Sequence, residues 1–436
     1  MKVLKFGGTS VGSPERIRNV ASLVSSRGKN IIVLSAMSGT TNSLLQISAA
    51  TEAADTAKAE SLIADLEKKY GLIIDQLYST DAAKATAGGK VNGFFDEIRE
   101  IVNADDKSRA EKKIVAYGEL ISTNLMTYYL QESGLNAILL PALDYMRTDA
   151  NGEPDQEYIR KHLAEILKDN PVADLYITQG FICRDPEGRI DNLQRGGSDY
   201  TASLIGAAIN ADEVQIWTDI DGMHNNDPRF VEGTTPVHNL HFEEAAELAY
   251  FGAKILHPTC ILPAKENNIP VRLLNTMQPD AEGTLINNVL RHGLIKAVAA
   301  KDDITAIKIK SDRMLLAYGF LKKVFDIFDK YATAIDMIVT SEVGVSLTID
   351  NTRHLDAILG ELNALGTVTV DSDMVIICVV GDLEWQNRGF EAKALDALRD
   401  IPVRMISYGG SNFNISFLIK KEDKKAALAK LSANLF

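Results

Sequence analysis

The chain opens with Met1-Lys2-Val3-Leu4-Lys5-Phe6-Gly7-Gly8-Thr9-Ser10-Val11-Gly12, and this stretch decides its fold. The apolar residues Val3, Leu4 and Phe6 predict a buried parallel strand. Gly7 and Gly8 end it, because two adjacent glycines let the backbone turn sharply and bring its N–H groups close to an anion. The stretch therefore predicts a buried strand followed by a glycine loop.

A helix start follows this loop. Ser13 suits the N-cap, Pro14 the first helical position and Glu15 the first turn. A loop at a helix N-terminus suits phosphate, and the ammonium of Lys5 at the strand end can reach the same phosphates. Neither the Walker A pattern nor the G-x-G-x-x-G fingerprint is present, so the glycines alone fit a tight turn equally well.

Length and composition limit the classes of protein to which the chain can belong. A chain of 436 residues predicts two to four domains, and 46% hydrophobic with 24% charged residues is ordinary for a globular protein. The net charge of -13 argues against a nucleic-acid partner. Cys183, Cys260 and Cys378 are widely spaced, without zinc-type spacing, which suits a reducing cytosol. With no signal peptide and no membrane-spanning apolar run, we expect a cytoplasmic enzyme or regulator without a membrane partner.

Strands alternate with helices over the first two thirds of the chain. Helical material is expected from about 43 to 130, with a polar break near Gly88-Gly89. The other expected helices span 14–27, 200–209 and 241–251, and the expected strands span 30–36, 136–140, 174–181, 213–217 and 270–274. This order predicts an α/β fold, with an open, mainly parallel sheet covered by helices.

The pattern changes near residues 276–300, where short strands begin to bracket single helices. The expected strands span 305–309, 343–349, 374–380, 403–407 and 413–419, and the expected helices span 320–330 and 390–398. We therefore expect two small α+β modules after the large α/β domain.

Four stretches of the α/β part carry small, charged and glycine residues: 5–10, 35–42, 195–201 and 218–229. Each follows an expected strand or opens an expected helix, so all four should lie beyond the carboxyl ends of parallel strands, where such sheets bind ligands. Phosphoryl transfer needs mainly positioning and charge neutralisation there. A carboxylate acceptor needs no general base, so the lack of an obvious catalytic histidine favours a kinase that forms an acyl phosphate.

Several motifs, in this order, resemble those of the aspartate kinases in the amino-acid kinase family. They are Lys5-Phe6-Gly7-Gly8-Thr9-Ser10-Val11, Arg195-Gly196-Gly197-Ser198-Asp199, Thr218-Asp219 with Asp227-Pro228-Arg229, and Phe251-Gly252-Ala253-Lys254-Ile255-Leu256-His257-Pro258. The resemblance implies an amino-acid-kinase domain over residues 1–290 and a regulatory region over 296–436. The two modules of that region resemble ACT domains, one at about 311–379 and one formed by 296–310 plus 380–436.

The resemblance also implies roles for single residues. Catalysis would fall to Lys5, Gly7, Gly8, Thr9 and Asp199, and substrate binding to Ser35, Thr41, Glu119, Arg195 and Ser198. ATP, with Mg²⁺, would be held by Lys5, Gly8, Thr218, Asp219, His224, Arg229 and Lys254, with no metal ligand assigned. Many family members carry Tyr where His224 stands, which leaves that contact open. Glu119 could instead be a surface residue of a helix, Asp219 a turn former, and Lys254 a helix C-cap.

The first ACT-like module resembles the effector module of lysine-inhibited aspartate kinases. The implied effector residues are Ser311, Met314, Gly319, Phe320, Leu321, Asp336, Ser341 and Glu342. We expect feedback inhibition by lysine, with threonine as the alternative effector, and a homodimer or homotetramer, because ACT modules commonly pair across subunits.

The predicted reaction converts ATP and L-aspartate to ADP and 4-phospho-L-aspartate, the first step toward lysine, threonine and methionine. The expected enzyme is monofunctional, because no dehydrogenase extension follows the second module. A related kinase acting on glutamate, N-acetylglutamate or a nucleotide is one alternative, and a non-catalytic amino-acid sensor is another. The intact Lys5, Glu119, Arg195 and Asp199 argue against the sensor.

Overall fold

The computed structural model describes residues 1–193, 196–252, 256–311, 314 and 318–436. The chain forms two compact units, one with Met1–Gly222 and Leu256–Asn288, and one with Met223–Ile255 and Val289–Phe436. They are called unit 1 and unit 2 below. Arg195 and Lys254, two of the predicted site residues, lie outside the described residues.

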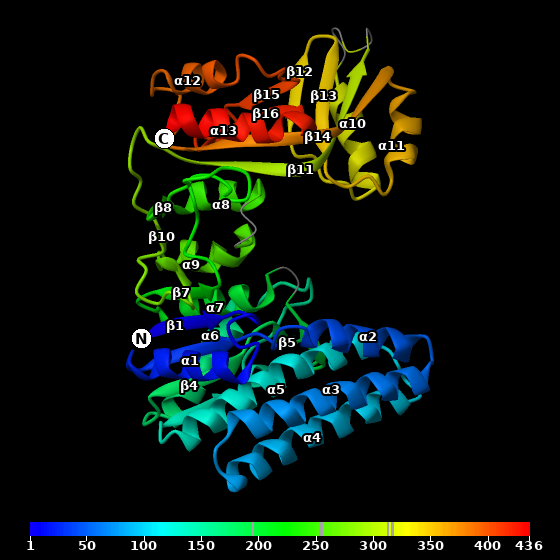
Figure 1. Ribbon diagram of the computed structural model, residues 1–436. Helices are drawn as coiled ribbons and strands as arrows, with labels where there is room; N and C mark the ends of the chain where they lie inside the picture. Colours follow the sequence, from blue (N-terminus) through cyan, green and yellow to red (C-terminus); the bar gives the residue numbers. More distant parts are fainter. Residues whose placement is uncertain (194–195, 253–255, 312–313, 315–317) are drawn as a thin grey trace. The chain divides into compact units, whose positions relative to one another are not determined.

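Unit 1 is built from strands and helices, with a run of consecutive helices over residues 40–132 (Figure 1). Its strands are β1 (Lys2–Phe6), β2 (Asn30–Leu34), β3 (Ala137–Leu140), β4 (Leu175–Gln179), β5 (Ile182–Arg184), β6 (Ile190–Asn192), β7 (Val214–Thr218), β9 (Val271–Asn275) and β10 (Thr284–Asn287). Its helices are α1 (Pro14–Ser25), α2 (Thr40–Glu52), α3 (Thr56–Leu77), α4 (Asp81–Asn103), α5 (Ala110–Glu132), α6 (Gln156–Asp169), α7 (Gly197–Ile209) and α9 (Leu262–Glu266).

The main sheet of unit 1 has the strand order β3-β4-β2-β1-β7-β9-β10. Neighbouring strands are parallel from β3 to β9, and β10 is antiparallel to β9. Leu4, Phe6, Ile32 and Leu34 bury one face of this sheet in the core shared with α1 to α5. Side chains alternate between the faces of a strand, so Lys5 points to the opposite face, where α7 lies. The predicted mainly parallel α/β fold is confirmed.

The expected break at Gly88-Gly89 is wrong. Both glycines lie inside α4, and the chain breaks instead between α2 and α3, between α3 and α4, and between α4 and α5. Two of these breaks are marked by N-caps, because the side chain of Asp55 accepts from Lys58 N–H and that of Thr80 from Ala83 N–H. A glycine inside a helix costs only about 1 kcal/mol relative to alanine. Burial of the apolar side of α4 outweighs that cost.

Unit 2 contains a short strand and helix from the middle of the chain, together with its C-terminal third. The strands are β8 (Asn239–His241), β11 (Ile295–Lys310), β12 (Ile338–Ser341), β13 (Gly344–Ile349), β14 (Thr367–Gly381), β15 (Met405–Tyr408) and β16 (Asn414–Lys420). The helices are α8 (Phe242–Tyr250), α10 (Phe320–Lys330), α11 (Leu355–Leu362), α12 (Phe390–Ala397) and α13 (Lys424–Leu435). The main sheet has the order β12-β13-β11-β14-β16-β15.

Two strands of this sheet are much longer than the sequence predicted. β11 and β14 pair antiparallel along most of their length, with register shifts around Lys301 and Ile304. Val298 of β11 belongs to a core with α12 and α13, whereas Ile307 and Ile309 of the same strand belong to a second core with α10 and α11. The charged run 301–303 interrupts the apolar pattern between these two halves. For this reason the sequence predicted only the second half, 305–309, as a strand.

Two further observations concern the molecule as a whole. Within the described ranges, no helix has the length and apolar character that a membrane crossing requires. Cys183, Cys260 and Cys378 are all buried free thiols.

The predicted domain boundaries at about 290 and within the C-terminal region stay predictions. The two compact units follow a different division, in which Met223–Ile255 joins the C-terminal residues.

Candidate functional site

The glycine loop after β1 packs closely against the loop after β2. Gly8 carbonyl accepts from Ser38 N–H at 3.1 Å, and a Cβ on Gly8 would lie 2.6 Å from the carbonyl oxygen of Ala36. Gly7 N–H donates to Trp217 carbonyl at the end of β7. The loops after β1 and β2 and the end of β7 thus meet at the carboxyl edge of the sheet, and only glycine fits at position 8.

Lys5 and Asp199 form an ion pair at this edge. Lys5 Nζ lies 2.6 Å from Asp199 Oδ1, and both side chains are largely buried. Lys5 comes from β1, whereas Asp199 lies in the first turn of α7. The pair brings together two residues that are 194 positions apart and that the sequence predicted to be catalytic.

The second glycine loop leads directly into α7. Gly196, the N-cap residue, has a φ of +73°, and a Cβ there would lie 1.8 Å from Cys260 Sγ, so a side chain is excluded. Just beyond it, Ser198 accepts a hydrogen bond at 2.9 Å from the hydroxyl of Ser35, at the end of β2. Ser122 on α5 donates to the carbonyl of Ser35 at 2.8 Å. These contacts place Ser35 between α5 and α7.

Glu119 is buried on α5, with 5% of its surface exposed. Its Oε1 accepts from Ala36 N–H at 3.1 Å, so it lies directly beneath the loop after β2. Burial raises the pKa of the Glu119 carboxyl to about 8, against smaller lowering contributions from hydrogen bonds and from Lys5. The reading of Glu119 as a surface residue is therefore excluded. A buried carboxyl of this kind is suited to receive a cation.

Three further predicted residues lie at loop ends in unit 1. Thr41 is exposed in the first turn of α2, whose N-cap Gly39 supplies no side-chain hydrogen bond. Thr218 ends β7, and its hydroxyl donates to the exposed Asp219 at 3.1 Å. All three side chains are at least partly accessible to a ligand.

Two predicted nucleotide residues belong to unit 2. His224 Nδ1 lies 2.9 Å from the hydroxyl of Thr234. Arg229 is mostly exposed and forms an ion pair with Asp227 at 2.7 Å.

The predicted effector residues of unit 2 differ in exposure. Ser311 is buried and donates to the carbonyl of Leu365 at 2.7 Å. Met314, Phe320 and Leu321 pack on the core of α10 and α11, and Gly319 is the N-cap of α10. Asp336 has only 1% of its side chain exposed. Ser341 and Glu342 are exposed at the turn between β12 and β13.

One residue at the strand ends was missed by the sequence analysis. The hydroxyl of Thr276 lies 2.7 Å from that of Ser10 in the glycine loop and donates to the carbonyl of Thr218 at 2.8 Å. It therefore ties the loop after β1 to the end of β7. The only signal in the sequence was a hydroxyl residue two positions after the expected strand at 270–274.

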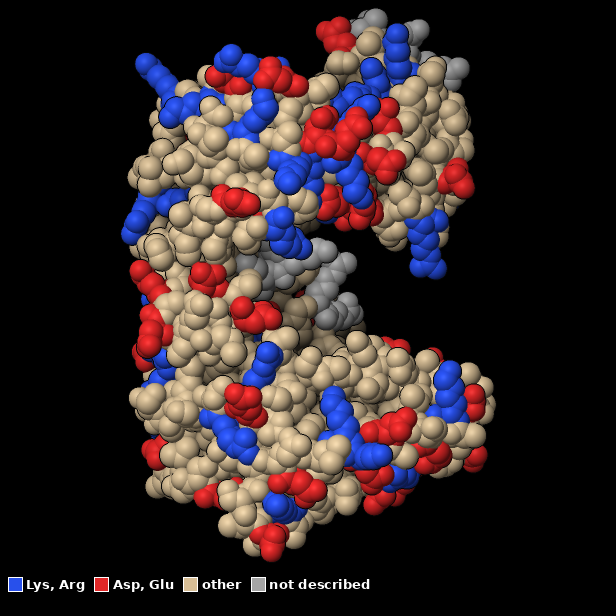
Figure 2. All heavy atoms as spheres, in the orientation of Figure 1, with Lys and Arg blue, Asp and Glu red and all other residues tan. Residues whose placement is uncertain are grey.

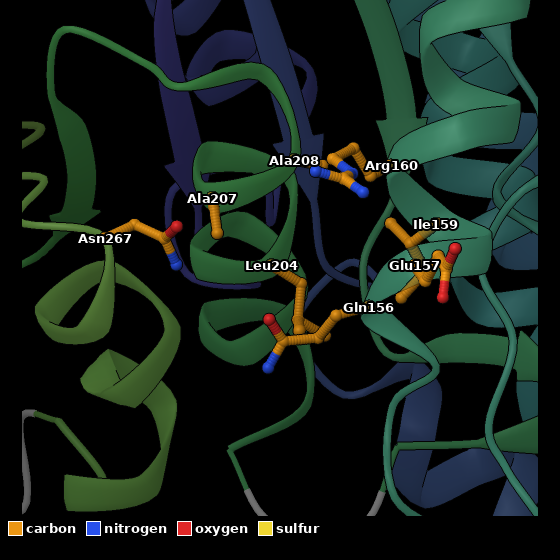
Figure 3. Close-up of a pocket in the computed structure, with 8 residues that line it drawn as sticks. All are labelled: Gln156, Glu157, Ile159, Arg160, Leu204, Ala207, Ala208 and Asn267. Carbon is orange, nitrogen blue, oxygen red and sulfur yellow. The ribbon is translucent and has the colours of Figure 1, made fainter.

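The structure also has a surface pocket of about 350 Å³ away from these residues (Figure 3). It lies between α6 and α7 and is lined by Gln156, Glu157, Ile159, Arg160, Leu204, Ala207, Ala208 and Asn267. None of the predicted site residues that the structure describes is among these lining residues. On the face of the molecule in Figure 2, acidic and basic side chains are interspersed, so neither sign dominates that surface.

The carboxyl edge of the unit 1 sheet thus combines the groups that phosphoryl transfer uses. It has a glycine loop, an ammonium oriented by a carboxylate, two hydroxyls and a buried carboxyl. Such a site can neutralise phosphate charge through Lys5 and hold an amine through Glu119.

Comparison with known proteins identifies the family. The model of the amino acid kinase family matches residues 1–275, and an ACT domain model matches residues 377–435. Lysine-sensitive aspartokinase 3 of Escherichia coli is 33% identical, over 100% of this chain and 99% of that protein. Chloroplastic aspartokinase 1 of Arabidopsis thaliana is also 33% identical, over 100% of this chain and 80% of that protein.

Solved structures agree. The crystal structure of E. coli aspartokinase III in complex with aspartate and ADP matches with a TM-score of 0.84 and 33% identity, over 100% of both chains. Clostridium acetobutylicum aspartate kinase matches with a TM-score of 0.87 at 23% identity over 100% of both chains, which shows the shared fold. The predicted resemblance is confirmed, and the chain belongs to the aspartokinases of the amino acid kinase family.

Proposed function

We propose that this aspartokinase transfers the γ-phosphoryl group of ATP to the side-chain carboxylate of L-aspartate, giving ADP and 4-phospho-L-aspartate. The observation that carries the proposal is the Lys5–Asp199 pair at the glycine loop, with the buried Glu119 beneath the neighbouring loop. Support also comes from E. coli aspartokinase III, whose structure contains aspartate and ADP.

The central difficulty of the reaction is electrostatic. The attacking carboxylate is already ionised near pH 7, so it needs no general base, but it must approach an anionic phosphate. Lys5 supplies positive charge where charge develops on the transferred group, and Asp199 holds its ammonium in place. Gly8 and Thr9 are proposed to offer backbone N–H groups to the same phosphate, whereas the N–H of Gly7 holds the loop on the carbonyl of Trp217.

We propose that ATP enters with Mg²⁺. Among the described residues, no three His, Cys, Asp or Glu side chains form a group that could hold a metal ion. Mg²⁺ is commonly held by phosphate oxygens and water with one or two carboxylates, and a donor set of that size fits this site. The ion would neutralise phosphate charge. Thr218, Asp219, His224, Arg229 and Lys254 are proposed to line the nucleotide.

The amino-acid end of the site is proposed to involve five residues. Glu119 suits the ammonium of aspartate, and Arg195 suits a carboxylate, because a guanidinium makes two parallel hydrogen bonds. Ser35, Thr41 and Ser198 would supply hydroxyls beside them. The contact between Ser35 and Ser198 supports this grouping.

We propose that lysine inhibits the enzyme through the C-terminal region, where two ACT-like modules share the long strands β11 and β14. The two separate cores on one sheet support this division. A structure of E. coli aspartokinase III holds lysine and aspartate in its T-state, which supports lysine over threonine. The effector would contact the eight predicted residues, including Asp336, Ser341 and Glu342. A homodimer or homotetramer in the cytoplasm is part of the same proposal.

The test is an assay of ADP release with ATP and a panel of acceptors. Aspartate, glutamate, N-acetylglutamate and a nucleoside monophosphate are compared at equal concentration. The proposal predicts ADP release that depends on aspartate and not on the other acceptors. Release that depends on another acceptor would support the related kinase instead, and no release with any of them would support a sensor.

A further inference from the structure

A polar cluster in unit 2, centred on the buried carboxylate of Asp336, connects the end of α8 to this predicted effector residue. Asp336 Oδ1 accepts from the hydroxyl of Tyr250 at 2.7 Å and from Lys301 Nζ at 2.6 Å. Lys301 Nζ also lies 2.9 Å from Asp350 and 4.3 Å from the centre of the Tyr250 ring. Tyr250 of α8 and Lys301 of β11 thus meet at the carboxylate of Asp336, and Lys301 also joins it to Asp350 at the other end of the β12–β13 hairpin.

The end of α8 is held firmly at this place. Gly252, two residues after Tyr250, lies so close to β11 that a Cβ would be 2.3 Å from the carbonyl oxygen of Ala300. The ring of Tyr250 packs edge-on against Phe251, which is buried. Burial and the bond to Asp336 raise the pKa of Tyr250 to about 12, so its hydroxyl stays a donor over the working pH range. The helix end is therefore anchored beside Lys301 through backbone, ring and hydroxyl.

The carboxylate of Asp336 is not saturated. Its Oδ2 is buried and has no hydrogen-bond partner within the described part of the chain. A buried acceptor without a donor is costly, so a ligand ammonium would find a favourable position there. That ammonium would interact with the same negative charge that now attracts the Tyr250 hydroxyl and the Lys301 ammonium. A ligand ammonium at Oδ2 would thus weaken the hold of Oδ1 on Tyr250 and Lys301, because all three donors draw on the charge of one carboxylate.

We infer that Tyr250 is a positioning residue that couples effector binding at Asp336 to the kinase part of the chain. Tyr250 lies within the residues matched by the amino acid kinase family, and Asp336 lies among the predicted effector residues. In the ligand-free state the Tyr250 hydroxyl holds the end of α8 on Asp336. Effector binding draws the carboxylate away and releases α8. The inference rests on the proposed effector role of Asp336.

The test compares Tyr250→Phe with Tyr408→Phe. Tyr408 is a matched control, since its hydroxyl also makes one hydrogen bond, at 2.9 Å to the carbonyl of Leu383, and it is similarly exposed at 37% against 43%. Lysine and threonine binding to the full chain is measured by calorimetry, and inhibition of the kinase is measured in parallel. Thermal unfolding of each variant shows that it is folded.

Removing the competing hydroxyl should tighten effector binding by about tenfold, the effect of one hydrogen bond to a charged group. The uninhibited rate of Tyr250→Phe should move toward the inhibited rate, and further inhibition should shrink. Tyr408→Phe should bind the effector as the wild type does. A loss of packing alone would lower the unfolding temperature without tightening binding.

Two results would overturn the inference in different ways. If the wild type binds and is inhibited by lysine or threonine, but Tyr250→Phe has an unchanged or weaker affinity, the coupling role of Tyr250 is wrong and the effector proposal stands. If the wild type binds neither amino acid at millimolar concentration, the effector proposal fails and the coupling inference fails with it.

Discussion

At the scale of single residues, the site depends on groups whose charge is set by their surroundings. Lys5 owes its position to strand alternation, which turns it away from the core side of Leu4 and Phe6 and toward Asp199. Glu119 owes its raised pKa to burial beneath Ala36. These two residues carry the sharpest predictions about chemistry.

Lys5→Ala should lower kcat by roughly 10²–10³-fold, because a preorganised charge at the transferred group is lost. The change leaves the largely buried Asp199 without its cation, so the unfolding temperature should fall as well, and thermal unfolding shows whether the variant is folded at the assay temperature. Steady-state kinetics with saturating ATP and aspartate measures the effect. A kcat close to that of the wild type would remove Lys5 from catalysis.

The raised pKa of Glu119 predicts that aspartate binding is coupled to the release of a proton. With a pKa of about 8, the carboxyl is mainly protonated at pH 6.5 in the free enzyme. An aspartate ammonium beside it favours the ionised form, so binding at pH 6.5 should release close to one proton. Affinity should therefore rise with pH, by at most about tenfold per unit, and level off above about pH 8.

Calorimetry in two buffers with different ionisation enthalpies measures this proton release. Glu119→Gln keeps the size of the side chain but has no proton to release, so its binding enthalpy should be the same in both buffers. Aspartate binding to the wild type without proton release at pH 6.5 would show that Glu119 does not face the ammonium.

At the scale of elements, the sequence predicted most strands and helices of unit 1 but misread the long helical region. Asp55 and Thr80 carried the true N-cap signals, whereas Gly88-Gly89 suggested a break that burial of α4 overrides. The contacts of Thr276 and the continuity of β11 and β14 depend on tertiary pairing, which no local pattern records. The glycines, by contrast, could be predicted, because at Gly8 the backbone itself excludes a side chain.

Replacing a glycine by alanine should have opposite effects on stability in α4 and in α5. A Cβ at Gly89, in the interior of α4, meets no heavy atom within 4 Å, so Gly89→Ala should stabilise the protein by about 0.5–1 kcal/mol. A Cβ at Gly118, on α5, would lie 2.7 Å from Ala36 Cβ, so Gly118→Ala should destabilise it. Denaturant unfolding of both variants checks the pair. Equal effects of the two changes would contradict the packing described for α5.

At the scale of the whole molecule, the motifs established the family before any contact was known, since their order spans both units. The sequence could not predict that Met223–Ile255, which carries His224 and Arg229, clusters with the C-terminal residues. That grouping arises from contacts such as the hydrogen bond from Asn226 to the carbonyl of Leu428 at 3.0 Å, between segments 202 residues apart. It places part of the predicted nucleotide site in the same compact unit as the predicted effector residues.

The proposed reaction moves the phosphoryl group to the side-chain carboxylate of aspartate. Hydroxylamine tests it most directly, because it attacks an acyl phosphate and leaves a hydroxamate while phosphate departs. Enzyme, ATP, Mg²⁺ and aspartate with hydroxylamine should yield aspartate 4-hydroxamate, one per ADP formed, identified by mass spectrometry, with Lys5→Ala forming it far more slowly. ADP formed without any hydroxamate, or a hydroxamate on the α-carboxyl group, would contradict the claim.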